Sequence, residues 1–136
     1  MPIKVINLLE MAAEPDAKRT NLINGPRFNA WFHIYKRPGQ RDEMHCHNAD
    51  QTFCCIGGEC TLHFPDGGTE VLRPGMVALI TGGSFYQLEN SGTEPMVMLG
   101  CRAASEQAVQ TIGYESRQEL FPREDITPPR GTSILV

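Results

Sequence analysis

Two stretches of the chain decide its fold: GQRDEMHCHNADQTFCCIGG at residues 39–58 and GMVALITGGSFYQLEN at residues 75–90. The first follows the pattern G-x5-H-x-H-x3-Q-x6-G, and the second follows G-x5-T-x-G-x2-Y-x3-N. Each contains short apolar runs that end at glycine pairs or at asparagine, residues that tight turns prefer. Both stretches therefore predict short strands separated by turns.

The first stretch places two histidines, His45 and His47, two residues apart. In a strand this spacing puts both rings on one face and Cys46 on the other, because side chains alternate between the faces. Two imidazoles on one face can bind one metal ion. Taken alone, the pair is equally compatible with two surface histidines that bind nothing.

Turn signals recur every eight to twelve residues along most of the chain. The strands between them are expected at residues 28–37, 43–47, 51–56, 60–64, 69–73, 77–81, 84–90 and 95–102. The sequence PDGG at residues 65–68 is expected to close a hairpin between two of these strands. Many short strands at this spacing are typical of an antiparallel sandwich or a closed barrel.

The two ends of the chain have a different pattern. Residues 3–12 are compatible with one strand or one short helix, and residues 103–112 predict a short helix with Ser105 as a candidate N-cap. Residues 121–131 are rich in proline and are expected to run extended over the surface. The apolar end at residues 133–136 is expected to dock, for example on a partner subunit.

Length, charge and cysteine content limit the class of protein. The 136 residues suffice for one domain, and no apolar run is long enough to span a membrane. The formal net charge of −4 argues against nucleic acid as a partner, because phosphate binding needs a basic surface. The five cysteines are odd in number, and the N-terminus lacks the apolar segment of a signal peptide. These features indicate a cytoplasmic protein with free thiols.

Together the two stretches resemble the cupin superfamily, whose motifs are G-x5-H-x-H-x3-E-x6-G and G-x5-P-x-G-x2-H-x3-N, and every spacing matches. The resemblance implies an all-β fold, a double-stranded β-helix or jelly-roll barrel, over residues 28–102. Residues 1–27 are then an N-terminal arm. Residues 103–136 are a C-terminal tail of the same domain, with a short helix or an extended course. The resemblance also implies a homodimer.

The resemblance further implies a metal site inside the barrel, since the family usually holds a divalent ion with three histidines and one glutamate. By position these ligands fall on His45, His47, Gln51 and Tyr86. Gln51 stands in place of the glutamate, Tyr86 in place of a histidine, and Thr81 in place of the proline of the second motif. Histidine and glutamine suit several first-row ions, so the metal is Mn, Fe, Ni or Zn, with its identity open.

The two departures at the metal change the chemistry that such a site supports. Gln51 removes one negative charge, which leaves the ion a stronger Lewis acid that the protein holds less tightly. Tyr86 either binds as a phenolate, which a nearby cation favours, or stays neutral and acts as a general acid or base. A third interpretation is a site that has lost its metal.

Three functional hypotheses follow. The first is an enzyme that acts on a small polar or aromatic acid by metal-assisted lyase or isomerase chemistry, with Tyr86 moving the proton. The second is an iron-dependent dioxygenase, which the neutral Gln51 disfavours because it stabilises Fe(III) less than a carboxylate would. The third is a non-catalytic protein that binds a small molecule, for example as a sensor.

Other residues near the site each allow two interpretations. One face of the strand at 28–37 carries Trp31, His33 and Tyr35, and the other carries Phe32, Ile34 and Lys36. Which face lines the barrel is open at this point, so His33 is either a substitute metal ligand or a packing residue. Arg41 and Arg102 are either clamps for a substrate carboxylate or solvated surface charges.

Overall fold

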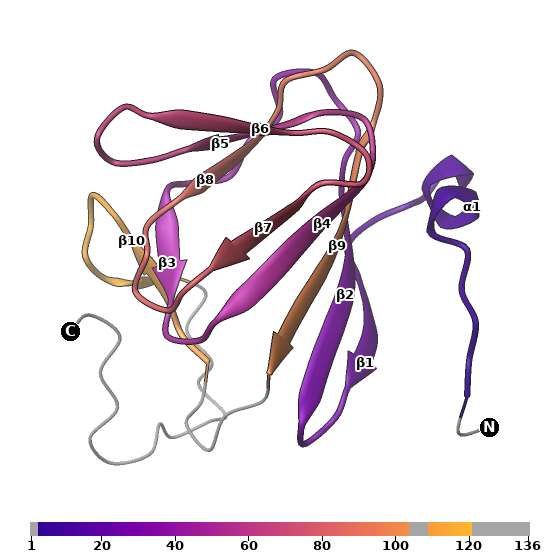
Figure 1. Ribbon diagram of the computed structural model, residues 1–136, viewed down its shortest axis with the longest axis horizontal. Helices are drawn as coiled ribbons and strands as arrows, with labels where there is room; N and C mark the ends of the chain where they lie inside the picture. The colour runs from indigo at the N-terminus through magenta and orange to yellow at the C-terminus, as the bar shows by residue number, and fades with distance from the viewer. Residues whose placement is uncertain (1–2, 104–108, 121–136) are drawn as a thin grey trace.

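The strands of the protein form two layers (Figure 1). The computed structural model describes residues 3–103 and 109–120 of the chain. One layer is a five-stranded antiparallel sheet in the order β1-β2-β9-β4-β7. Its strands are β1 (Thr20–Asn24), β2 (Phe28–Tyr35), β9 (Met96–Ala103), β4 (Gln51–Gly57) and β7 (Val77–Ile80).

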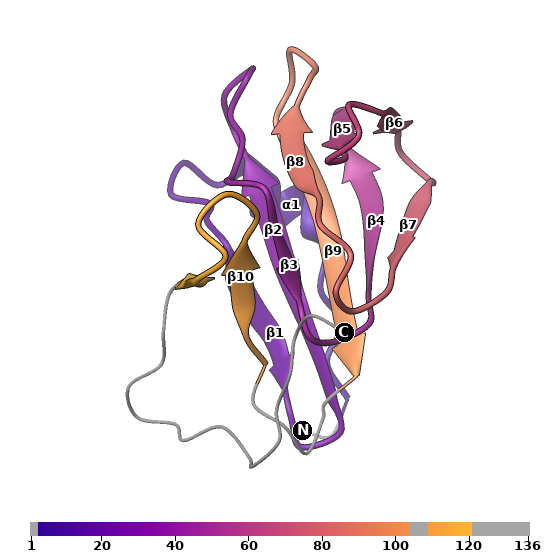
Figure 2. The same cartoon turned by 90° about the vertical axis from the view of Figure 1, so that its left-hand side faces the viewer.

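The second layer consists of two three-stranded sheets in the orders β11-β10-β3 and β6-β5-β8. Their strands are β3 (His45–His47), β10 (Thr111–Gly113), β11 (Glu119–Leu120), β5 (Cys60–His63), β6 (Thr69–Leu72) and β8 (Gln87–Asn90). The antiparallel bridges His45↔Tyr86 and Arg41↔Glu89 join the segment around β3 to the segment around β8. These bridges join the two sheets into one layer opposite the five-stranded sheet. In Figure 2, β3, β8 and β10 are on the side nearest the viewer, and α1 lies behind the five-stranded sheet.

This architecture confirms the predicted all-β barrel. All eight strands expected between residues 28 and 102 are present, close to their predicted bounds. The predicted turn at residues 65–68 joins β5 to β6, which pair as an antiparallel hairpin. Gly58, which ends the first motif, has φ 73°, and a Cβ there would collide with the backbone carbonyl of Pro95. A side chain is excluded at that position, which explains why the motif ends in glycine.

The two faces of β2 point into two different clusters, which answers the question that the sequence left open. Trp31 belongs to the core between the layers, and His33 and Tyr35 line the same interior. Phe32 and Ile34 point the opposite way, into a second cluster with Val97 on the outer face of the sheet. Partly buried side chains of Leu8, Met11, Ala12, Ala17, Leu22 and Ile56 cover that second cluster. The face that carries Trp31 and His33 is therefore the one that lines the barrel.

The N-terminal stretch forms a helix and not a strand. Helix α1 (Leu8–Ala13) begins at Asn7, whose side-chain oxygen accepts hydrogen bonds from the backbone N–H groups of Leu9 and Glu10, both at 3.1 Å. This is the arrangement of a helix N-cap, which satisfies amides that the first turn leaves unpaired. Strand β1 follows and pairs with β2, so residues of the predicted arm pack on the main sheet.

The short helix predicted over residues 103–112 is wrong at both of its ends. Ala103 is the last residue of β9, and Thr111 is the first residue of β10. Residues 104–108 between them, with Ser105, lie outside the described residues, as does the tail at 121–136. Thr111 pairs with His47 across the β10–β3 ladder, so pairing with a distant strand overrides the local helical preference.

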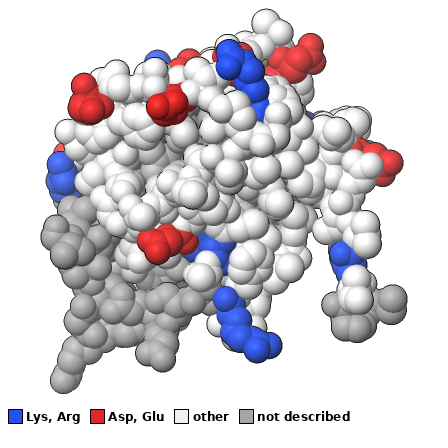
Figure 3. Space-filling model, viewed as in Figure 1, with Lys and Arg blue, Asp and Glu red and all other residues white. Residues whose placement is uncertain are grey.

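The surface in Figure 3 carries single acidic and basic side chains separated by wide uncharged areas, without a continuous basic area on this face. On the outer face of the five-stranded sheet, the exposed apolar side chains include Phe28, Val77 and Leu79. Within residues 3–103 and 109–120, no helix has the length and hydrophobicity that a membrane span requires.

Candidate metal centre and ligand cavity

A cavity of about 640 Å³ lies between the two layers of the fold. Residues of both layers line it. The aromatic, charged and hydrogen-bonding side chains of the lining include Arg19, Trp31, His33, Tyr35, Asp42, His45, His47, Phe53, Tyr86, Arg102 and Thr111. Aromatic rings and charged groups therefore face one another inside the barrel. A volume of this size accommodates a small organic molecule.

His45, on β3, is held in one tautomer by its neighbours. The residue is buried, and its Nδ1 lies 2.6 Å from the carbonyl oxygen of Glu43. Since a carbonyl oxygen only accepts hydrogen bonds, Nδ1 is the donor in this contact. A carboxylate oxygen of Asp42 lies 3.6 Å from the same Nδ1. Such partners orient an imidazole and leave its other nitrogen for a metal or a ligand.

His47 lies beside His45, with the two ring centroids 4.9 Å apart. Its Nδ1 is hydrogen bonded at 2.9 Å to Oγ1 of Thr111, the residue that faces it on β10. Burial, together with the smaller effects of the charges of His45 and Arg102, lowers the pKa of His47 to about 3. His47 is therefore neutral at physiological pH, which is the form that binds metals.

Gln51, the first residue of β4, reaches Tyr86 from the opposite layer. Its Nε2 donates a hydrogen bond of 2.6 Å to the hydroxyl oxygen of Tyr86. Its Oε1 is buried and has no hydrogen-bond partner among the described residues. The ring centroid of Tyr86 lies 4.7 Å from that of His45 and 6.2 Å from that of His47. The four residues that the resemblance selected thus lie together inside the barrel, although they come from distant parts of the chain.

Tyr86 is a neutral phenol in this setting. The residue is 2% exposed, and burial raises its pKa above the ordinary value, with the charge of Asp42 adding to the effect. The hydrogen bond from Gln51 acts in the opposite direction and is a smaller influence. Because its oxygen accepts a hydrogen bond from an amide, the hydroxyl proton of Tyr86 remains free to be donated.

The donor atoms of the site fit a divalent ion. Two imidazoles and an amide oxygen are a set that first-row metals accept. The unpartnered Oε1 of Gln51 is the most informative atom, since a buried amide oxygen without a partner costs free energy that a cation would recover. In residues 3–103 and 109–120, no three His, Cys, Asp or Glu side chains gather as a metal site. At this site glutamine and tyrosine occupy two of the four family positions.

Asp42 belongs to the site, although the sequence analysis did not single it out. One of its oxygens accepts a hydrogen bond of 2.9 Å from the N–H of Leu88, and the other faces His45. Burial raises the pKa of Asp42 to about 6, and the nearby His45 opposes that rise. The one signal in the sequence was its position three residues before His45. Thr111 gave no signal, because only the pairing of β10 with β3 brings it to the site.

His33 faces the cavity as a neutral ring among aromatic side chains. Its centroid lies 4.8 Å from that of Tyr35 and 5.6 Å from that of Phe53, and both of its buried nitrogens lack a partner within residues 3–103 and 109–120. Burial, together with the smaller effect of the charge of Arg19, lowers the pKa of His33 to about 4. It joins no cluster of three ligands with the other two described histidines of the cavity. These contacts favour the packing interpretation of His33.

The two candidate clamps for a carboxylate are in different places. Arg41 is exposed and pairs through its backbone with Glu89, away from the cavity. Arg102 lines the cavity, and its guanidinium carbon lies 4.9 Å from the centroid of the Trp31 ring. The guanidinium of Arg19 lies 5.4 Å from the same ring, a contact that no local pattern predicted.

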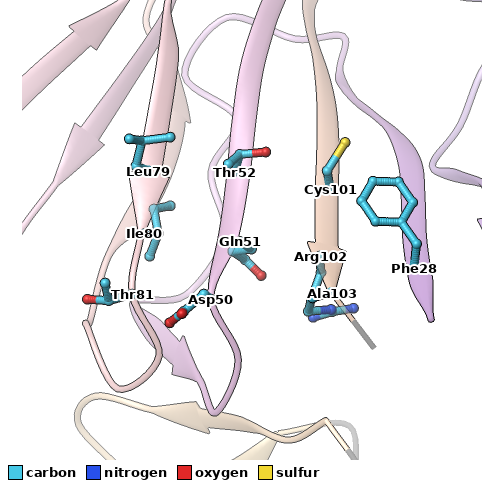
Figure 4. A pocket seen from close by; sticks show the side chains of 10 residues that line it. All are labelled: Phe28, Asp50, Gln51, Thr52, Leu79, Ile80, Thr81, Cys101, Arg102 and Ala103. Carbon is cyan, nitrogen blue, oxygen red and sulfur yellow. The ribbon is translucent and has the colours of Figure 1, made fainter. Parts of the chain in front are cut away.

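A second and more open cavity of about 320 Å³ lies at one end of the five-stranded sheet (Figure 4). Phe28, Thr52, Leu79 and Cys101, from four adjacent strands, contribute to its lining. Cys101 lies here and does not line the larger cavity. Gln51 and Arg102 also border this second cavity, whereas the histidines His33, His45 and His47 line the larger one.

Comparisons with known proteins agree with this architecture. The family model described as cupin domain matches residues 33–100. No curated protein matches the chain. Among solved structures, an uncharacterized conserved protein with a double-stranded beta-helix domain from Klebsiella pneumoniae is 21% identical, with a TM-score of 0.66. That match covers 80% of this chain and 96% of the Klebsiella chain.

Two further structures show the same fold. A protein from Bacillus halodurans is 18% identical over 79% of this chain and 85% of its own, with a TM-score of 0.66. The cupin domain of an XRE family transcriptional regulator from Enterobacter cloacae is 20% identical, with a TM-score of 0.57. That match covers 65% of this chain and 96% of the Enterobacter chain. At these identities the similarity concerns the fold alone.

Proposed function

The chain belongs to the cupin domain family, and from this premise we propose that it binds one divalent metal ion and acts on a small polar or aromatic acid. The proposed chemistry is a metal-assisted lyase or isomerase reaction. His45, His47 and Gln51 hold the ion, which is Mn, Fe, Ni or Zn. Tyr86 either completes the ligand set or transfers a proton, and its neutral state favours proton transfer.

The observation that carries this proposal is the unpartnered Oε1 of Gln51 next to two oriented histidines. A fold that needed Gln51 only for packing would pair or expose its amide, because an unpaired buried polar atom is costly. The hydrogen bond of Gln51 Nε2 to Tyr86 fixes the amide and leaves the oxygen free. These contacts support a site that is completed by a cation.

The metal, when bound, supplies a positive charge that polarises a substrate oxygen. The side chains of the protein then bind and orient the substrate. Tyr86 holds a proton in a buried position and can donate it to a substrate atom beside it. Gln51 orients the hydroxyl of Tyr86 through the 2.6 Å hydrogen bond. Trp31 and Phe53 pack edge to face in the lining and exclude water.

Metal analysis of protein purified without an affinity tag tests the metal site. We expect about one equivalent of a first-row ion in the wild type and none in the double variant His45→Ala/His47→Ala. The control is His63→Ala, since His63 pairs with Glu89 outside the cavity and its loss leaves the metal in place. A wild type that stays without metal after reconstitution with each of the four ions contradicts the proposal.

Turnover by Tyr86→Phe tests the role of Tyr86 as proton donor, and oxygen uptake distinguishes the two enzyme hypotheses. For the lyase or isomerase, we expect metal to remain bound and turnover of the acid to fall about 100-fold or more, because the proton donor is lost. The iron-dependent dioxygenase is the alternative, and it is identified by oxygen consumption that requires iron. Turnover without oxygen uptake supports the lyase or isomerase and excludes the dioxygenase.

A second candidate function is ligand binding without turnover. It is favoured by the occupants of two family ligand positions, where Gln51 and Tyr86 replace glutamate and histidine. The similar cupin domain from Enterobacter cloacae is part of a transcriptional regulator, which is a precedent for this use of the fold. Binding of a small molecule with no chemical change in it, in wild type and Tyr86→Phe alike, would establish this function.

A homodimer is the proposed assembly, through the outer face of the five-stranded sheet. Leu79 is 77% exposed and Val77 is 51% exposed, and apolar residues grouped on a surface mark contact sites. Sedimentation velocity tests this directly. We expect a dimer for the wild type and a monomer for Leu79→Asp, whereas a monomeric wild type contradicts the proposal.

A further inference from the structure

Two arginines share one aromatic ring in the interior. The guanidinium carbon of Arg102 lies 4.9 Å from the centroid of Trp31, and that of Arg19 lies 5.4 Å from it. Trp31 is 4% exposed, whereas Arg102 is half-buried and Arg19 is exposed. Both arginines line the cavity. Contact with the face of an indole fixes the two guanidinium groups in place.

The register of the sheet builds this arrangement. Trp31 on β2 pairs with Gly100 on β9, and a Cβ at position 100 would collide with the indole. Glycine therefore allows the ring to lie against β9. Arg102, two residues further on the same face of β9, approaches the ring from that strand. Arg19 immediately precedes β1 and approaches from the other neighbour of β2.

The two positive charges have no acidic partner in the described part of the chain. The ion pairs found there involve other residues. Arg19 donates from one guanidinium nitrogen to the side-chain oxygen of Asn21 at 3.2 Å. Among the described residues, the buried Nε of Arg102 has no hydrogen-bond partner, and neither has the side-chain oxygen of Asn29, which faces Arg102 across the sheet. A cation in such a position is costly to the free protein and is stabilised by an anion.

We propose that Arg102 and Arg19 form a subsite for the carboxylate of a small organic acid, with Arg102 as the interior contact and Arg19 closing it from the outer side. A planar guanidinium pairs with a carboxylate through two hydrogen bonds, which gives both affinity and orientation. The aromatic lining of the cavity makes an aromatic carboxylate the best match in size and character. This inference rests on the proposed function, since it assigns the acid group of the proposed substrate.

The location of Arg102 connects this subsite to the reactive groups. On the five-stranded sheet, Arg102 is directly opposite Gln51 on the neighbouring strand β4. Residues in that relation have Cβ atoms roughly 5 Å apart. Gln51 in turn contacts Tyr86. A molecule whose carboxylate is bound at Arg102 therefore has the rest of its structure beside Gln51 and Tyr86.

Calorimetric titration of the full chain with benzoate and benzamide tests the subsite. The protein is first treated with a chelator, so that the carboxylate has no metal to bind. We expect benzoate to bind and the neutral benzamide not to bind. Arg102→Gln is expected to raise the Kd of benzoate about ten-fold or more, and Arg19→Gln about three-fold, because the charge-assisted pair at Arg102 is the more buried one.

Two controls make the result specific. Arg37→Gln removes an exposed arginine outside the cavity and is expected to leave the Kd unchanged. The melting temperature of Arg102→Gln is expected to equal or exceed that of the wild type, because the variant loses a half-buried charge that has no acidic partner among the described residues. A structural role in stacking on Trp31 would instead lower it. A lower melting temperature with unchanged benzoate affinity overturns the proposal.

Equal binding of benzoate and benzamide also overturns the subsite. The same titration is made with two aliphatic acids, oxalate and succinate, and the subsite is overturned if neither they nor benzoate bind. These outcomes are independent of the metal, since the metal content of the arginine variants is measured separately. A protein that holds metal through His45 and His47 but binds no carboxylate when the metal is removed would disprove the subsite and leave the proposed metal site intact. Carboxylate binding that survives His45→Ala/His47→Ala would support the subsite even where the metal site fails.

Discussion

Phe32 and His33 are neighbours on β2, yet their surroundings have opposite character. Phe32 is fully buried on the outer face of the sheet, in an apolar cluster with Ile34 and Val97 that helix α1 helps to cover. His33 faces the interior, where neither ring nitrogen has a partner in the described part of the chain. The same strand thus supplies tight apolar packing to one face and unsatisfied polar groups to the other.

This contrast extends across the whole five-stranded sheet. The buried side-chain atoms without hydrogen-bond partners, counted over the described residues, belong to Asn29, His33, Gln51 and Arg102. All four are on strands of this sheet, and none belongs to the cluster beneath α1. Unpaired polar atoms lower stability, so a fold tolerates them where a ligand later pairs with them. The outer face therefore contributes stability, and the inner face carries the unpaired polar atoms that the proposed ligands would bind.

The largest expected effect comes from the outer face. Phe32→Ala should lower the free energy of unfolding by about 3–5 kcal/mol, because it leaves a cavity in a fully buried apolar cluster. Urea denaturation measures the loss, and benzoate titration of the folded fraction should give an unchanged Kd. A loss below about 1 kcal/mol would mean that the cluster beneath α1 is loosely packed, and the contrast between the faces would fail.

The second effect is a pH dependence that comes from the inner face. The unfolded chain protonates His33 near pH 6.5, whereas burial lowers the pKa of His33 in the folded protein to about 4. Between these values only the unfolded state takes up the proton. The contribution of His33 to stability is therefore complete above pH 6.5 and is lost as the pH falls toward 4, by up to about 1.4 kcal/mol per pH unit.

His33→Phe checks this assignment. Denaturation of chelator-treated wild type and variant is compared from pH 7.5 to pH 4. The difference in unfolding free energy between the two proteins should change by about 3 kcal/mol in favour of the variant as the pH falls. Parallel curves for the two proteins would show that His33 does not titrate as its burial requires.

The third effect is a change in metal affinity at the proposed metal site on the inner face. Gln51→Glu restores the acidic residue that the family motif has at this position and returns a negative charge to the site. We expect affinity for a divalent ion to rise about ten-fold or more, measured by competition with a chelating dye at pH 7.5. The matched control is Gln118→Glu, the same substitution at an exposed position. Equal affinities for the two variants would show that Gln51 does not contact the metal.

The smallest effect concerns the helix that covers the outer face. Asn7→Ala removes the side-chain oxygen that accepts from the amides of Leu9 and Glu10. This loss of an N-cap should cost about 1 kcal/mol in the free energy of unfolding, with no change in metal content. Asn7→Asp retains the acceptor and should recover most of the stability. If both variants are as stable as the wild type, α1 contributes little to the outer face.

The strands and turns of the barrel were predictable because each is set by the types of a few consecutive residues. Glycine and asparagine at fixed intervals bounded the eight central strands, and PDGG at residues 65–68 closed the hairpin between β5 and β6. Alternation placed the rings of His45 and His47 side by side. Asn90 ends the second motif and is of a residue type whose side chain commonly bonds to the backbone of a turn. Its side chain does bond to the backbone of Tyr35, Gly92 and Glu94.

Several parts of the site were not predictable from any local pattern. Thr111 holds His47 only because β10 pairs with β3, more than sixty residues earlier in the chain. Arg19 reaches Trp31 only because β1 lies beside β2. The helix expected at residues 103–112 was wrong for the same reason, since its ends are strands. Strand pairing between distant segments depends on the whole topology, which a sequence window does not contain.

The sequence by itself determined that this chain forms a barrel of short strands and carries His45, His47, Gln51 and Tyr86 at matching motif positions. Turn chemistry and side-chain alternation are properties of a few consecutive residues, so they can be deduced without a fold. Only the tertiary structure decided that His33 and Arg102 face the interior and that Phe32 faces outward. That choice depends on which face of a strand meets the opposite layer, and this is fixed by the packing of the two layers and not by either strand alone.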